Sequence, residues 1–368
     1  MGGAGESVRF LILSCNTGEG HNACARAIRE ELERRGVACD VADGLRFVSP
    51  AASRFISDWH VRLYRWLPQV YARAYDYADR HAAMMNQDAL ICRFLGLGCK
   101  RLRAHILAGG YDGVLCTHLF PAIMLSRMQR KDPLPIRTGF IATDYTASPG
   151  CGAISTDYCF IPDERLAGNF AAAGISRSRI VASGIPVRAA FRETGEGDPL
   201  PRILLMGGSM GCGPIRRLVG ELVRRLPRAQ IGVVCGSNRR LERQLNRGFG
   251  ALSGVRIHGR VDNVPELMDG AALYLTKPGG ISVTEACAKA LPLVLIPVVG
   301  GCEGYNLRFY VDAGAARTAR KPRELAEICA GLIGDKAARG AMSEAMKAMR
   351  HQNAAQVICD IMTGAVTR

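Results

Sequence analysis

The sequence predicts an α/β protein made of two consecutive halves, each built on a parallel sheet. The chain has 368 residues, enough for two domains of ordinary size. In both halves short apolar segments alternate with helical patterns, which is typical of parallel sheets. Each half also opens with the same series of a strand, a glycine-rich turn and a helix. No sequence repeat accompanies this series, so the similarity between the halves is one of architecture.

The first half is predicted to open with a strand, the glycine turn NTGEG at 16–20, and a helix over 21–35 that Gly36 ends. Further apolar runs follow at intervals that leave room for helices. The predicted strands are 8–14, 37–41, 113–117, 138–142 and 158–161.

The second half repeats this order after a polar segment rich in glycine and proline, RETGEGDPLP, which predicts a linker at 192–201. The predicted domains are therefore 1–191 and 202–368. The glycine-rich segment 207–213 precedes a helix over 214–226, and three helices beginning near Pro322, Asp335 and Gln352 close the chain. The last of them is expected to pack back on the first domain. The predicted strands are 202–206, 230–235, 255–258, 271–276 and 293–297.

Residues 54–80 depart from this pattern and predict an amphipathic helix with aromatic side chains on one face and arginines on the other. Two interpretations remain open: a helix that lies in a membrane interface, and a helix packed on the first sheet with a solvated basic face. The residues assigned to membrane contact are Trp59, Arg62, Arg65 and Trp66.

Composition excludes several classes of protein. Hydrophobic residues make up 48% of the chain and charged residues 22%, and no apolar run approaches the roughly 18 residues of a membrane-spanning helix. The fourteen cysteines are scattered and form no C-x-x-C pair, so neither a zinc site nor redox chemistry is indicated. Reduced thiols in a cytoplasmic protein are the expectation.

The formal net charge of +15 predicts attraction to a polyanion, whether a nucleic acid, an anionic lipid or a phosphorylated substrate. Charge alone does not choose among these. Aromatic residues make up only 6% of the chain, which argues against nucleic-acid binding.

The segment 276–306 carries the strongest chemical signal. A predicted strand leads into Pro278-Gly279-Gly280 and a helix over 282–290, and ligands of open α/β sheets lie beyond the carboxyl ends of such strands. The glycines permit close approach to a ligand, and the helix N-terminus offers N–H groups to a phosphate. Glu285, one turn into the helix, could accept hydrogen bonds from a ribose. The alternative is a tight turn followed by an acid that favours the helix N-terminus.

Taken together, four polar clusters, at 16–21, 184–188, 207–213 and 259–306, resemble glycosyltransferase family 28 in order and spacing. The N-terminal half is most similar to the monogalactosyldiacylglycerol synthases and processive diacylglycerol glucosyltransferases. Its segment NTGEGHNACARAI matches their Gly-x-Gly-His turn, and Thr143-Asp144-Tyr145 matches their Thr-Asp-Tyr motif.

The resemblance implies a GT-B architecture, two Rossmann-like domains facing across a cleft, and an inverting reaction with no metal site and no cofactor besides the UDP-glucose or UDP-galactose donor. Arg188 is then expected at the donor diphosphate, together with Ser209 and the GGSMG backbone at the N-terminus of the next helix. Lys277 is expected beside the donor phosphates, Val261 at the uracil and Glu285 at the ribose. Glu303 and Asn306 are expected at the transferred sugar. The full donor set is Arg188, Gly208, Ser209, Met210, Val261, Lys277, Gly279, Gly280, Ile281, Glu285, Glu303 and Asn306.

The same resemblance assigns the base that deprotonates the acceptor hydroxyl to His21, with Asp144 as the other candidate. Gly18, Gly20 and Tyr145 are expected at the acceptor. This chain departs from the diacylglycerol enzymes after Thr-Asp-Tyr, where Ser148 stands at their usual histidine position, and in the loop GGCEGYN.

The sequence therefore predicts a cytoplasmic enzyme, peripheral on the inner face of the cell membrane, that transfers glucose or galactose to a lipid hydroxyl of diacylglycerol. Its expected partners are the UDP-sugar, the lipid acceptor and an anionic membrane surface. Three alternatives stay open: a polyprenyl-linked or soluble acceptor, a UDP-sugar epimerase, and a paralogue that binds nucleotide sugar or lipid without turnover.

Overall fold

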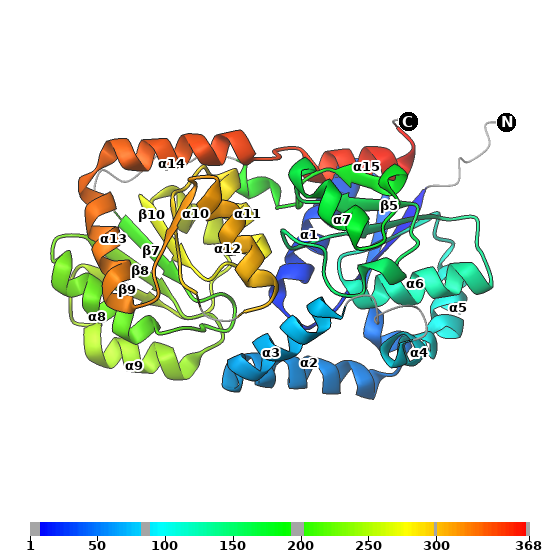
Figure 1. The fold of residues 1–368 in the computed structure, drawn as a ribbon, viewed down its shortest axis with the longest axis horizontal. Helices are drawn as coiled ribbons and strands as arrows, with labels where there is room; N and C mark the ends of the chain where they lie inside the picture. The colour runs from blue at the N-terminus through cyan, green and yellow to red at the C-terminus, as the bar shows by residue number, and fades with distance from the viewer. Residues whose placement is uncertain (1–7, 82–88, 193–201, 298–299, 366–368) are drawn as a thin grey trace. The chain divides into compact units, whose positions relative to one another are not determined.

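The computed structural model describes residues 8–81, 89–192, 202–297 and 300–365, and the chain separates into two compact units (Figure 1). Unit 1 comprises Met1–Tyr64, Arg73–Arg188 and Asn353–Arg368. Unit 2 comprises Arg65–Ala72 and Ala189–Gln352. Almost all of the linker predicted at 192–201 lies outside the described residues, which resume at Arg202.

Unit 1 contains a six-stranded parallel sheet of order β2-β1-β3-β4-β5-β6, with its core between the sheet and the surrounding helices. The strands are β1 (Arg9–Ser14), β2 (Ala38–Asp43), β3 (Gly113–Cys116), β4 (Arg137–Ile141), β5 (Tyr158–Ile161) and β6 (Ile180–Ala182). The helices of this part of the chain are α1 (Glu19–Arg34), α2 (Pro50–Trp66), α3 (Pro68–Arg80), α4 (Leu90–Gly96), α5 (Cys99–Gly109), α6 (Leu119–Lys131), α7 (Ala167–Ala172) and α15 (Ala354–Thr363).

Unit 2 contains a second six-stranded parallel sheet, of order β12-β11-β10-β7-β8-β9. Its strands are β7 (Arg202–Met206), β8 (Gln230–Val234), β9 (Val255–His258), β10 (Leu273–Thr276), β11 (Leu293–Leu295) and β12 (Ala316–Thr318). Its helices are α8 (Ile215–Arg225), α9 (Arg239–Phe249), α10 (Val264–Asp269), α11 (Gly280–Ala288), α12 (Cys302–Asp312), α13 (Pro322–Gly334) and α14 (Lys336–Met349). The prediction of two parallel-sheet α/β halves is therefore confirmed.

The edge strands β6 and β12 were not predicted. Each is three residues long, and half-buried side chains make up all of β6. Such a strand has too few residues to show the apolar run by which the central strands are recognised. Both strands are held by parallel pairing with the neighbouring strand, β5 for β6 and β11 for β12.

The prediction of a single helix over 54–80 is wrong. The chain forms two helices, α2 and α3, separated at Leu67, because Pro68 begins the second helix. Proline lacks the N–H of the helical ladder and disfavours a helical conformation in the residue before it. On α2 the Phe55 and Trp59 side chains are 68% and 56% exposed, whereas Ile56 packs against the unit 1 core.

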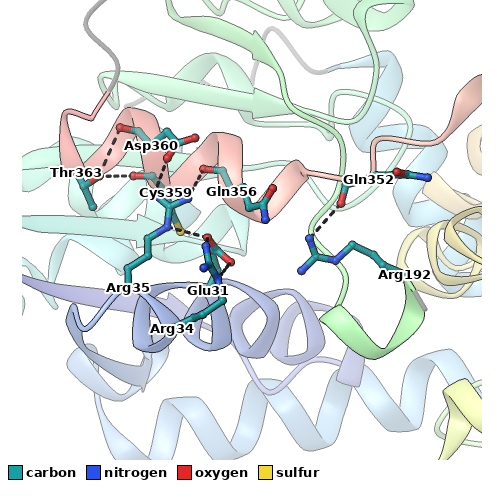
Figure 2. Close-up of polar contacts among 9 residues, drawn as sticks. All are labelled: Glu31, Arg34, Arg35, Arg192, Gln352, Gln356, Cys359, Asp360 and Thr363. Carbon is teal, nitrogen blue, oxygen red and sulfur yellow. Dashed lines mark hydrogen bonds and ion pairs between the residues drawn. The ribbon is translucent and has the colours of Figure 1, made fainter.

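The last helix, α15, belongs to unit 1, although the segment before it belongs to unit 2. It lies against α1 and buries Ile358, Cys359 and Met362 (Figure 1). Figure 2 shows the polar part of this contact, in which Arg35 at the end of α1 lies between Glu31 and Asp360. The Arg35 guanidinium donates to the Glu31 carboxylate at 2.7 Å and to the Asp360 carboxylate at 2.6 Å.

The fourteen cysteines are free thiols, and most of them are buried. Burial raises the pKa of Cys151 to about 12, and desolvation is also the largest cause of the raised pKa of Cys329. A thiol with such a pKa is protonated at neutral pH and is a poor nucleophile. Among the described residues, no helix is long and apolar enough to cross a membrane.

Candidate active site

In unit 1 the candidate catalytic residues follow three neighbouring strands. β1 pairs with β3, β3 pairs with β4, and Leu13, Cys116 and Phe140 lie side by side near the carboxyl ends of the three strands. The segments that leave this edge carry the turn at 16–20, Thr117-His118 and Thr143-Asp144. The sheet thus brings together residues that lie more than 100 positions apart in the sequence, at the edge where open α/β sheets bind ligands.

The turn before α1 is held by a chain of side-chain hydrogen bonds. The Ser14 hydroxyl donates to Asn22 Oδ1 at 2.7 Å, and Asn22 Nδ2 donates to Asn16 Oδ1 at 3.1 Å. Asn16 Nδ2 in turn donates to the Asp43 carboxylate at 3.2 Å. These contacts tie the first turn of α1 to the ends of β1 and β2, and they fix the direction in which His21 leaves the helix.

His21 lies in the first turn of α1 and is anchored on the next strand of the sheet. Its Nδ1 lies 2.8 Å from the Thr117 carbonyl oxygen and 3.1 Å from Thr143 Oγ1. A carbonyl oxygen only accepts, so Nδ1 carries the proton and donates it. The neutral ring therefore has its lone pair on Nε2. A fixed imidazole with an unprotonated Nε2 is the form that a general base requires.

The environment of His21 favours the neutral ring. Burial lowers its pKa, while the Asp144 carboxylate and the hydrogen bond to Thr117 raise it and offset part of this effect. Asp144 is half-buried in the segment that follows β4. The structure therefore places both candidate bases in one cluster, with the charge of Asp144 acting on the His21 ring.

His118 is a member of this cluster that sequence reasoning missed. Its ring packs edge-on against that of His21, with centroids 4.5 Å apart. His118 caps α6, and its Nδ1 accepts from the Phe120 N–H at 3.1 Å, which leaves the proton on Nε2. The signal available in the sequence was a histidine directly after the predicted strand 113–117.

The other predicted residues of unit 1 lie in different environments. Gly18 is the N-cap of α1 and Gly20 lies in its first turn; an added Cβ at Gly18 meets no atom within 4 Å. Tyr145 is buried, at 7% exposed. Arg188 is half-buried and is the last residue of this part of unit 1.

In unit 2 the predicted donor residues follow a row of strand ends in register. Leu295 of β11 pairs with Thr276 of β10, which pairs with Met206 of β7, and the row continues through Val234 of β8 to His258 of β9. The residues predicted to bind the donor therefore leave the sheet along one edge.

An ion pair lies at the centre of this edge. Lys277 Nζ lies 2.5 Å from Glu303 Oε1, and the two side chains are 16% and 7% exposed. Gly208 makes room for it, because an added Cβ there would lie 2.6 Å from Lys277 Cε. Gly279 lies beside the pair, where an added Cβ would be 3.7 Å from Lys277 Nζ, an ordinary contact. Gly208 also has a φ of +71°, which favours glycine. The structure brings these four predicted residues together.

Further predicted residues surround α11. Asn306 is fully buried, and its Nδ2 donates to the Pro278 carbonyl at 2.9 Å. In this structure Asn306 therefore supports the turn that carries Gly279. Gly280 and Ile281 are buried in the first turn of α11. Glu285, half-buried one turn later, lies close enough to Tyr274 to add to the rise in its pKa that burial causes.

Ser209 was expected at the N-terminus of the following helix, and that placement is wrong. Helix α8 begins only at Ile215, and the segment Gly207–Gly213 forms its own turn, closed by the Cys212 N–H donating to the Gly207 carbonyl at 2.8 Å. The Ser209 carbonyl accepts from the N–H and hydroxyl of Ser237, at 2.8 and 3.1 Å. The glycines that allow this close packing separate the turn from α8, while the Ser209 side chain remains exposed.

The remaining predictions concern Met210, Val261 and the aromatic helix. Met210 is half-buried in the same turn. Val261 is half-buried in the turn GRVDN, which follows β9. Trp59 is exposed on α2. The side chains of Arg62, Arg65 and Trp66 lie outside the described residues.

Two family models match consecutive parts of the chain. The monogalactosyldiacylglycerol (MGDG) synthase model matches residues 21–187, which include His21 and Asp144. The model of the glycosyltransferase family 28 C-terminal domain matches residues 202–358, which include Lys277 and Glu303. The chain belongs to glycosyltransferase family 28.

Among curated proteins, this family 28 chain is 24% identical to a processive diacylglycerol beta-glucosyltransferase of Staphylococcus saprophyticus, over 96% of this chain and 92% of the relative. It is 27% identical to the protein of the same name from Bacillus licheniformis, over 95% and 93%.

Among solved structures, MurG of Acinetobacter baumannii has a TM-score of 0.65 at 16% identity, over 97% of this chain and 99% of that chain. The UDP-GlcNAc 2-epimerase of Neisseria meningitidis bound to UDP-GlcNAc has a TM-score of 0.64 at 14% identity, over 97% and 100%. The predicted GT-B fold class is confirmed, and the family 28 chain is a glycosyltransferase.

Proposed function

We propose that this glycosyltransferase moves glucose or galactose from a UDP-sugar to the free hydroxyl of diacylglycerol, with inversion at the anomeric carbon. The relatives named as processive diacylglycerol beta-glucosyltransferases, which match over nearly the whole chain, support the acceptor class. The observation that carries the mechanism is the anchored His21, whose Nδ1–H is held by the Thr117 carbonyl and whose Nε2 lone pair is left for a proton.

In the proposed reaction the acceptor hydroxyl oxygen attacks the anomeric carbon of the donor while its proton passes to His21 Nε2. The bond between that carbon and the diphosphate oxygen breaks, and UDP leaves with the bonding electron pair. Attack from the face opposite UDP converts an α-linked donor into a β-linked glycolipid. The burial that lowers the pKa of His21 keeps the ring neutral, and therefore able to accept the proton, at neutral pH.

Unit 2 is proposed to hold the donor along its edge of strand ends. Negative charge builds on the diphosphate as the bond breaks, and the guanidinium of Arg188, the N–H groups of the GGSMG turn and the N-terminus of α11 are suited to stabilise it. Glu285 is proposed to accept from the ribose hydroxyls. Glu303 is proposed to recognise the transferred sugar. The ion pair with Lys277 is proposed to keep the Glu303 carboxylate charged and in position.

The proposed lipid acceptor requires contact with a membrane surface. Phe55 and Trp59 lie exposed on α2, with nearly parallel rings whose centroids are 6.3 Å apart. Aromatic rings of this kind insert at the boundary between headgroups and acyl chains, and the net charge of +15 favours an anionic leaflet. We propose that this helix face binds the inner face of the cell membrane peripherally.

The test is a turnover assay with the purified chain, UDP-glucose or UDP-galactose, and vesicles that contain diacylglycerol. We expect UDP release coupled to a glycolipid whose anomeric proton shows the large coupling of a β-glucoside or β-galactoside. Glu285→Ala is expected to raise the donor KM, and Glu266→Ala, an acid on α10, serves as a control. UDP release without glycolipid, or glycolipid formation unaffected by Glu285→Ala, would contradict the proposal.

A further inference from the structure

Unit 2 contains a cavity at its β9 edge that none of the predicted donor residues lines. The cavity has a volume of about 930 Å³ and lies between α9 and the loops that follow β8 and β9. Its basic lining consists of Arg239, Arg243 and Arg247 of α9 and Arg260 of the loop after β9. We refer to this space as the arginine cavity. Its volume suits a small organic ligand rather than a single ion.

The three arginines of α9 lie on one face of the helix. They are four residues apart, the spacing that places side chains one above the next. Arg260, on the loop after β9, is the fourth arginine of the lining. All four side chains are exposed, and an anion bound among them would reduce the mutual repulsion of their positive charges.

These charges are not neutralised within the protein. In the part of the chain that the structure describes, none of the four guanidinium groups forms an ion pair with a carboxylate. The one acid that lines the cavity is Glu242, whose carboxylate packs against Gly259, where an added Cβ would lie 3.0 Å from it. The lining therefore carries four positive side chains against one negative. By contrast, Arg225 of α8 is paired with Glu221 and Glu327.

The arginine cavity lies apart from the residues proposed to read the sugar. In the sheet order, β9 is the edge strand, whereas Glu303 follows β11 at the other side of β7. The cavity wall nevertheless touches the donor turn, because Ser237 lines the cavity and donates two hydrogen bonds to the Ser209 carbonyl. The turn GRVDN also contributes Gly259 and Arg260 to the lining, directly before Val261, so a ligand here would lie beside the proposed position of the nucleotide.

We propose that the arginine cavity binds a second, phosphate-bearing ligand besides the sugar donor. Guanidinium groups bind phosphate oxygens through paired N–H donors, which makes arginine the preferred residue for this group. The phosphate can belong to a phospholipid headgroup or to a soluble phosphorylated compound, and both present the same chemistry to the four arginines. This inference stands independently of the proposed acceptor and reaction.

The test is a calorimetric titration of the purified chain with inorganic pyrophosphate in the presence of saturating UDP, which occupies the donor site. We expect the double variant Arg243→Ala/Arg247→Ala to weaken pyrophosphate binding by about tenfold or more, since each lost charge-assisted hydrogen bond contributes over a factor of ten. The matched control is Arg228→Ala/Arg240→Ala, which removes the same charge from exposed positions of unit 2 that do not line the cavity.

The proposal would be overturned if pyrophosphate did not bind in the presence of UDP. It would also be overturned if both double variants weakened pyrophosphate binding equally. A second arm identifies the source of the phosphate by co-sedimentation with vesicles of phosphatidylcholine, with or without phosphatidylglycerol. If the cavity variant loses binding to the anionic vesicles and the control variant keeps it, the ligand is a lipid headgroup. If both keep it while the cavity variant loses pyrophosphate, the ligand is a soluble phosphate compound.

Discussion

His21 Nδ1 donates to the carbonyl oxygen of Thr117 at 2.8 Å, and this contact determines which nitrogen of the ring is free to accept a proton. The two residues come from α1 and from the end of β3, so the packing of helix on sheet sets the tautomer. The carbonyl is a backbone group, and no side-chain substitution at position 117 removes it. The orientation of the base is thus a property of the fold.

The pH dependence of turnover follows from this environment. Because burial lowers the pKa of His21, we expect kcat to be constant at neutral pH and to fall only below the usual histidine value of 6.5. The folding stability contributed by His21 depends on pH in the same direction as kcat. Below 6.5 the unfolded chain binds a proton that the folded protein resists, so the His21 contribution destabilises the protein as pH falls. A kcat profile with its acidic limb above pH 6.5 would contradict this assignment.

Asp144→Asn separates the two candidate bases. The Asp144 carboxylate raises the pKa of His21, so its neutralisation is expected to move the acidic limb of the kcat profile to lower pH while the enzyme remains active. A base that accepts the proton itself cannot be replaced by an amide. Loss of turnover at every pH, in a variant that still binds UDP, would identify Asp144 as the base instead.

The ion pair between Lys277 and Glu303 predicts strong coupling in a double-mutant cycle. Since both side chains are largely buried, Lys277→Met leaves the Glu303 carboxylate uncompensated and is expected to cost about 3 kcal/mol of stability. Adding Glu303→Gln should restore most of this loss. Urea unfolding measures the four free energies, and additive effects of the two substitutions would show that the pair is not formed in solution.

Two glycine substitutions form a matched comparison. Gly208→Ala introduces a Cβ at a φ of +71° and 2.6 Å from Lys277 Cε, and is expected to cost on the order of 1–3 kcal/mol. Gly18→Ala meets no atom within 4 Å at an extended φ of 170°, so its stability should match the wild type within about 0.5 kcal/mol. Reduced turnover of a stable Gly18→Ala protein would then report the close approach of the acceptor.

The C-terminal helix predicts a long-range effect on unit 1. Ile358→Ala removes a fully buried side chain of α15 and is expected to cost about 3 kcal/mol, whereas Val357→Ala, at 37% exposed, should cost under about 1 kcal/mol. Hydrogen exchange measures the two units separately. We expect Ile358→Ala to lower the protection of β1 and β3 and to leave β7 and β8 unchanged. The opposite pattern would contradict the assignment of α15 to unit 1.

The sequence predicted several strands with the observed bounds because their signal is local. Arg202–Met206 and Val255–His258 have the predicted bounds, since each is a short apolar or alternating run between polar residues. The break at Leu67 could also have been predicted from Pro68, but the aromatic periodicity continues across it. At such a position the helix is interrupted despite the aromatic periodicity, because proline lacks the N–H that the helical hydrogen bond requires.

The contacts within the site were less accessible to sequence reasoning. Lys277 and Glu303 were assigned to different parts of the donor, and only the register of β10 and β11 brings their charges together. Asn306 was expected at the sugar, whereas its burial depends on how α12 packs beneath the turn of Pro278. His118 was missed because its approach to His21 depends on the pairing of β1 with β3.

The most direct test of the account is the steady-state kcat of His21→Ala with UDP-glucose or UDP-galactose and diacylglycerol vesicles. Loss of a general base is expected to lower kcat by about 10²–10⁴-fold, with the donor KM unchanged because His21 lies outside the proposed donor set. His105→Ala, a histidine of α5 in the same unit, controls for the loss of an imidazole. A His21→Ala enzyme that forms glycolipid at the wild-type rate would contradict the assignment of His21 as the base.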